Sequence, residues 1–128
     1  MLLPNEIDKI LFNTREIDVL AKNWDGSYEE KEKFHRMAKV ALKMIAKELG
    51  VPFTVRSNKG GPAVLGDAIL HSDNLYINLG GSCWNDSFMY RTVKGQKDYT
   101  GGTNNWMSYS ELAHDPKKAI KRFKNPIP

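Results

Sequence analysis

The chain has 128 residues, a length typical of one domain, with 41% hydrophobic and 27% charged residues. This composition excludes disordered and fibrous classes of protein. The apolar start at 1–3 runs into Pro4, Asn5 and Glu6, and no later run reaches the length of a membrane span, so we expect no membrane partner and no secretion signal. A single cysteine, Cys83, excludes an internal disulfide and multi-cysteine metal sites. We therefore expect a soluble, cytoplasmic protein.

The excess positive charge is confined to the C-terminal segment. Residues 1–115 carry 14 basic and 15 acidic side chains, whereas 116–128 carries five basic and no acidic ones, for a formal net charge of +4. A basic segment of this kind binds either nucleic-acid phosphates or an acidic protein surface. The alternative is that these lysines only complement a helix dipole and keep the chain in solution.

The N-terminal half has the pattern of helices. Within 1–26, apolar residues recur at steps of three and four, as one helix or as two short helices divided at Asn13-Thr14. Within 27–50, Ser27 and Glu30 form a capping box before a long apolar stripe. Gly50 supplies the C-cap of this long helix.

Beyond this helix the period changes to two, which predicts strands. Four strands are expected, at 53–56, 63–71, 75–79 and 87–94, with Gly66 as a bulge or close approach. Short connections between them favour an antiparallel β-meander within 51–94, and one face of this sheet would bury the apolar stripe of the long helix. The fold class is therefore α+β, with N-terminal helices, a four-stranded mainly antiparallel sheet and a C-terminal helix in a single domain, 1–128.

The segment 95–107 has no periodicity and is expected to be an ordered loop. Unstructured loops of this length tend to be functional, and leaving its aromatic residues in water would be unfavourable. Glycines in Gly101-Gly102 allow backbone N–H groups to approach an anion. The loop is thus a candidate site for a phosphate, a carboxylate or a nucleotide. The alternative is that its own aromatic residues only hold it in place. The candidate binding residues in and beside this loop are Arg91, Lys97, Tyr99, Asn104, Asn105 and Trp106.

After this loop, 108–128 is expected to be a basic helical segment. Ser108 and Glu111 form a second capping pattern, and Asp115-Pro116 begins the last helix.

The polar side of the predicted sheet is a second candidate site. Arg56, Tyr76 and Arg91 fall on it in three different strands, and arginine beside aromatic residues is a surface on which single-stranded nucleic acid stacks. Lys59 precedes Gly60-Gly61, for which a hairpin turn is favoured over a ligand loop. The three tryptophans lie in predicted loops, where they would form a protein interface or close over the core; they are Trp24, Trp84 and Trp106.

No catalytic or metal-binding set emerges from the sequence. The histidines lack the paired spacing of zinc ligands, and only the tertiary fold could bring His71, Asp73 and His114 together. Cys83 has no adjacent activating base. We expect no catalytic residue, no metal and no cofactor.

Three stretches resemble small accessory proteins of tailed bacteriophages: Val55–Gly61, Leu70–Tyr76 and Tyr90–Gly102. The likeness spans about 36–109 and leaves 1–25 outside, as a separate interaction element. It implies a bacterial host cytosol and an accessory role in infection, in which such proteins occupy a host enzyme or a defence nuclease.

Three functional hypotheses follow, in this order. The first is a non-enzymatic phage-type binding protein that occupies a host protein, a nucleic-acid surface or a complex of the two, including an inhibitor of host defence. The second is a DNA- or RNA-binding protein that uses the sheet arginines and the basic tail. The third is an enzyme acting on a phosphorylated substrate. The candidate binding residues are Arg56, Lys59, Tyr76, Arg91, Lys97, Tyr99, Asn104, Asn105, Trp106, Lys117, Lys118, Lys121 and Arg122.

Overall fold

Two long helices begin the fold, seen here in a computed structural model that describes residues 4–80, 87–99 and 102–127. Helix α1 (Pro4–Asn23) is continuous, because Asn13 and Thr14 donate side-chain hydrogen bonds to the carbonyls of Lys9 and Leu11 within the helix. Helix α2 (Tyr28–Leu49) begins where Ser27 Oγ accepts the Glu30 N–H, and it ends at Gly50 with φ 72°. The expected caps of α2 are therefore confirmed.

The strands form one antiparallel sheet in which every strand pairs with its neighbour in sequence. The sheet has the order β1-β2-β3-β4-β5, with β1 (Phe53–Asn58), β2 (Asp67–Ser72), β3 (Leu75–Gly80), β4 (Ser87–Thr92) and β5 (Asn105–Ser108). Five strands replace the four that were expected, because part of the predicted loop 95–107 pairs with β4, Met107 opposite Phe88. The α+β class and the meander are confirmed, with one strand added.

Several strand boundaries also differ from expectation. β4 ends at Thr92 instead of Lys94, because the chain turns at 94–97, and β3 extends by one residue to Gly80. β1 continues two residues beyond Arg56, and β2 begins at Asp67 rather than at Ala63, because 61–66 forms a turn. Gly66 is a point of close approach, since a Cβ there would lie 2.6 Å from the Asn58 carbonyl oxygen. The predicted loop around Cys83 and Trp84 lies outside the described residues.

The chain ends in two helices, α3 (Tyr109–His114) and α4 (Pro116–Lys124). Ser108 Oγ accepts the Glu111 N–H, and the Asp115 carboxylate accepts the Lys118 N–H, so both predicted caps are confirmed. No helix in the described ranges combines the length and the apolar character that crossing a bilayer requires.

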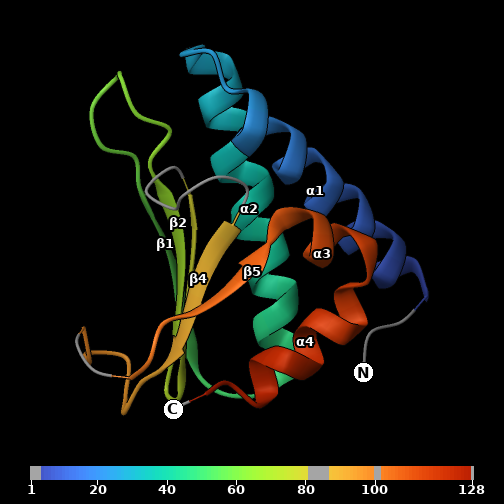
Figure 1. Cartoon of the computed structure of the whole chain (residues 1–128), viewed down its shortest axis with the longest axis vertical. Coiled ribbons are helices and arrows are strands. Elements are labelled where there is room, and N and C mark those ends of the chain that lie inside the picture. Colours follow the sequence, from blue (N-terminus) through green and yellow to red (C-terminus); the bar gives the residue numbers. More distant parts are fainter. Residues whose placement is uncertain (1–3, 81–86, 100–101, 128) are drawn as a thin grey trace.

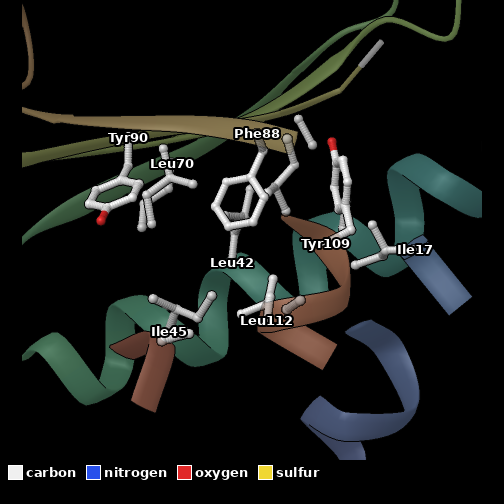
Figure 2. Packing of buried hydrophobic residues seen from close by; sticks show 14 of the residues in the cluster. Ile17, Leu42, Ile45, Leu70, Phe88, Tyr90, Tyr109 and Leu112 are labelled. Carbon is white, nitrogen blue, oxygen red and sulfur yellow. The ribbon is translucent and has the colours of Figure 1, made fainter. Parts of the chain in front are cut away.

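All four helices lie on one face of the sheet, the inner face (Figure 1). Phe88, Tyr90 and Leu70 of the sheet point toward Leu42 and Ile45 of α2, as Figure 2 shows. Most of these side chains are fully buried, and each contributes about 1.5–3 kcal/mol through removal from water. The core thus lies between the inner face and the helices, and no helix of the described residues lies on the other face of the sheet.

Candidate functional site on the outer face of the sheet

The face of the sheet opposite the helices, the outer face, is defined by the strand register. One row across the sheet pairs Thr54 with His71, His71 with Tyr76, and Tyr76 with Arg91. Because side chains alternate along each strand, and Leu70 and Ile77 face the core, this row points away from the helices. The structure places Arg56, Tyr76 and Arg91 on this face.

A series of three aromatic rings with an arginine at each end covers one end of the outer face. The Arg91 guanidinium lies over the Tyr76 ring, 4.6 Å from its centroid, and Tyr76 meets His71 edge-on at 5.3 Å. On its other side His71 meets Tyr99 at 5.5 Å, and the Arg56 guanidinium lies 5.7 Å from the Tyr99 centroid. We call these five residues, Arg56, His71, Tyr76, Arg91 and Tyr99, the aromatic cluster.

His71 lies at the centre of the aromatic cluster and is completely buried. Within the described part of the chain neither ring nitrogen forms a hydrogen bond of good geometry, although the Gly95 backbone lies close enough to interact with the ring. Burial lowers the pKa of His71 from its ordinary value, and the positive charges of Arg56 and Arg91 lower it further, while the Gly95 backbone and Asp98 oppose the shift. His71 is therefore held neutral between two arginines, where it separates the rings of two tyrosines.

The loop after β4 brings Tyr99 onto the cluster. The Val93 N–H donates to the Asn74 carbonyl, and the Gln96 amide donates to Asp73 at 3.0 Å, so the loop is attached to the β2–β3 turn. The Lys94 N–H donates to the Asp98 carboxylate, which closes a turn before Tyr99. The described part of this loop is therefore ordered by specific hydrogen bonds, and the Tyr99 side chain remains 64% exposed.

Trp106 marks the opposite edge of the outer face. The second cross-strand row runs from Arg56 through Ile69, Asn78 and Met89 to Trp106. Four strand spacings separate β1 from β5, so Arg56 and Trp106 lie about 19 Å apart. Trp106 is in a strand, not in the loop that was expected, and its side chain is 48% exposed.

Three predicted site residues serve the structure instead. Lys59 forms an ion pair with Glu32 of α2 at 2.8 Å, and this hydrogen bond lowers the pKa of Glu32. Asn105 is buried and exchanges hydrogen bonds with the backbone of Ile127, which fastens the C-terminal residues to β5. Arg122 donates to Glu111 at 2.6 Å, an interaction that raises the pKa of Arg122.

The remaining predicted residues are not part of the aromatic cluster. Lys97 and Asn104 are exposed in the loop that carries Tyr99. Lys117, Lys118 and Lys121 lie on α4, which packs into the core through Ala119, Ile120 and Phe123. The basic helix is therefore in the helical layer, separated by the sheet from the outer-face arginines (Figure 1). The sheet arginines and the basic tail form two surfaces.

The histidines do not converge. His71 faces outward from β2, whereas His114 ends α3 in the helical layer, and the Asp73 carboxylate accepts from Gln96. His35 of α2 is buried, and its ring nitrogens contact Ser57 Oγ and the Leu65 carbonyl. Within the ranges that the structure describes, no three His, Cys, Asp or Glu side chains group as metal ligands would.

His71 is the site residue that the sequence interpretation assigned to the wrong context. From the sequence pattern, His71 was interpreted only as a candidate for a catalytic or metal-binding role. A tight turn at Asp73-Asn74 joins β2 to β3 and pairs His71 with Tyr76. Period-two alternation would then have placed His71 beside Tyr76 on the polar face. The approach of Tyr99 carries no such signal, because it depends on the path of a loop.

Comparison with protein-family models, with curated proteins and with solved structures finds no match to this chain. The resemblance to phage accessory proteins therefore stays a prediction from the sequence pattern.

Proposed function

We propose that the outer face of the sheet binds single-stranded nucleic acid by stacking bases on its aromatic side chains. The observation that carries the proposal is the aromatic cluster, in which two arginines lie over two tyrosines on the sheet face opposite the four described helices. Base stacking on aromatic rings and arginine planes is how open sheets hold unpaired bases. Tyr99 and Trp106 offer exposed rings at the two ends of the face.

The charges on this face suit the binding of a polyanion with modest affinity. Lys94 and Lys97 are exposed in the loop that follows β4 and supply cations for phosphates. The acids on this side are Asp67 of β2, Asp73 and Asp98. Among the described residues, Arg56, Arg91, Lys94 and Lys97 thus outnumber these three carboxylates by one.

Fluorescence anisotropy with labelled oligo(dT), oligo(U) and a duplex of equal length tests the proposal. Both single strands should bind more tightly than the duplex, and their binding should weaken between about 50 and 200 mM salt. Because stacking contributes about 1–3 kcal/mol per base, Trp106→Ala and Tyr99→Ala should each weaken single-strand binding by roughly 5- to 150-fold.

Tyr28→Ala is the matched control. Tyr28 is 73% exposed, but it begins α2 in the helical layer, so its loss should leave the affinity unchanged. Circular dichroism verifies that each variant is folded. Absence of single-strand binding at about 50 mM salt, or equal losses for Tyr28→Ala and Trp106→Ala, would overturn the proposal.

A further inference from the structure

Within the described residues, none of the four lysines of α4 forms an ion pair, although several lysines elsewhere in the chain do. Lys22, Lys33 and Lys47 form ion pairs with carboxylates of α1, as Lys59 does with Glu32. The α4 lysines are all exposed, and no carboxylate in the described residues lies within ion-pair distance of them; they are Lys117, Lys118, Lys121 and Lys124. The excess charge of the chain is thus left uncompensated on one helix.

The two lysines of the first turn do not stabilise α4 through the helix dipole. Lys117 and Lys118 stand in the first turn, which contains no acidic residue, and positive charge is unfavourable at the N-terminal end of the helix dipole. Only Lys121 and Lys124 lie in the last turn, where the dipole favours cations. The first-turn lysines are therefore exposed cations to which an external anion can bind.

The same lysines line a groove of about 760 Å³ at the junction of α4 with the end of α2. Ile120 contributes an apolar part of the lining, and lysine stems add methylene groups beside it. Two carboxylates, Glu48 and Asp115, also border the groove. This mixture suits a peptide, because its acidic side chains can be spaced to meet the lysines and its apolar side chains can lie beside Ile120. A nucleic-acid backbone carries a phosphate at every nucleotide and has less freedom to keep its charges away from the two carboxylates.

We infer that this groove binds an acidic segment of a partner protein, with an apolar residue of that segment against Ile120. Carboxylates of the segment would pair with Lys117 and Lys121, which are spaced one helical turn apart. At about 1.5 Å per residue, α4 offers a contact about 13 Å long, which is enough for a short segment. The inference is independent of nucleic-acid binding on the outer face, because α4, which supplies most of the groove lining, lies on the opposite side of the sheet (Figure 1).

Anisotropy with a short labelled peptide of Glu and Leu at helical spacing tests the inference. The double variant Lys117→Glu/Lys121→Glu should weaken peptide binding by about tenfold or more, since it replaces attraction with repulsion. Lys39→Glu/Lys43→Glu is the matched control, because these two α2 lysines share the four-residue spacing and border a different hollow. The control should change the affinity by less than about twofold.

Further binding measurements distinguish peptide binding in this groove from nucleic-acid binding on the outer face. Trp106→Ala should leave peptide binding intact, and Lys117→Glu/Lys121→Glu should leave oligo(dT) binding intact. Peptides with Leu changed to Ser, or Glu changed to Lys, should bind weakly or not at all. If Lys117→Glu/Lys121→Glu fails to fold by circular dichroism, Lys117→Gln/Lys121→Gln replaces it.

Three outcomes overturn the inference. One is absence of peptide binding to the wild type at low salt, and another is an equal loss in the α2 control. The third is that the α4 substitutions abolish oligo(dT) binding without affecting the peptide, which would assign the lysines to nucleic acid.

Discussion

Arg91 lies over the ring of Tyr76, its direct partner across the β3–β4 ladder, with 4.6 Å between the guanidinium carbon and the ring centroid. Only 6% of Arg91 is exposed, so this charge is held against an aromatic face with little access to water. Desolvation strengthens such a cation–π contact, which makes the pair a structural support of the outer face as well as a part of it.

A double-mutant cycle between Arg91 and Tyr76 should reveal this contact. We expect Arg91→Leu and Tyr76→Leu each to lower the free energy of unfolding, with a coupling energy of about 0.5–2 kcal/mol between them. Urea unfolding of the wild type, the two single variants and the double variant measures this coupling energy. Additive effects of the two substitutions would show that the ring and the guanidinium contribute independently.

The free energy of unfolding should decrease as the pH falls from about 7 through 6.5, the ordinary histidine pKa. Burial lowers the pKa of His71 in the folded state, so the unfolded chain binds the proton first and acid favours unfolding. His35 contributes with the same sign, because burial also lowers its pKa. His71→Phe should therefore show a weaker pH dependence than the wild type in urea titrations, and an unchanged dependence would contradict the burial of a neutral His71.

Gly102→Ala should destabilise the fold by about 1–2 kcal/mol, because Gly102 has φ 75° and an added Cβ would lie 2.5 Å from the Thr92 carbonyl oxygen. Gly95 is in the same loop, but an added Cβ there meets nothing within 4 Å. Gly95→Ala is therefore the control, with an expected change below about 0.5 kcal/mol. Thermal unfolding compares them, and equal shifts in Tm would mean that Thr92 does not restrict this position.

Lys97→Met and Lys59→Met should differ in their effect on oligo(dT) binding. Lys97 is exposed in the loop that carries Tyr99, so its loss should reduce the slope of log Kd against log salt by about one. Lys59 is paired with Glu32, so its loss should leave the slope unchanged. If the slope of log Kd against log salt were smaller for Lys59→Met than for Lys97→Met, the phosphate contacts would lie nearer the β1–β2 turn than we expect.

The sequence predicted the local parts of this fold where the chemical signal was itself local. Ser27, Gly50 and Asp115 cap helices as expected, because caps depend on residues only a few positions apart. The fifth strand was missed because its alternation is inverted. Asn105 is buried and donates hydrogen bonds to the carbonyls of Thr103 and Ile127, while Trp106 faces solvent. The polarity of each side chain therefore predicts the wrong face of the strand for both residues.

The candidate site was predictable to the extent that it follows from period-two alternation. Arg56, Tyr76 and Arg91 come from three strands, and alternation alone places them on one face. Tyr99 reaches His71 through hydrogen bonds such as Gln96 to Asp73, which join segments 23 residues apart. Contacts at that separation depend on the assembled sheet, and no pattern within the loop encodes them.

The consecutive order of the strands has a consequence for folding. Each strand pairs with the strand that precedes it, so the sheet can grow in the order of synthesis by closing short loops. The helical layer cannot be completed in the order of synthesis, because it needs residues from both ends of the chain. Phe123, near the C-terminal end, packs against Tyr90 with 5.0 Å between ring centroids and belongs to the same core as Ile10 of α1. An incomplete chain can therefore form the meander while the apolar stripes of α1 and α2 remain partly uncovered, and these stripes are where a chaperone would bind a stalled chain.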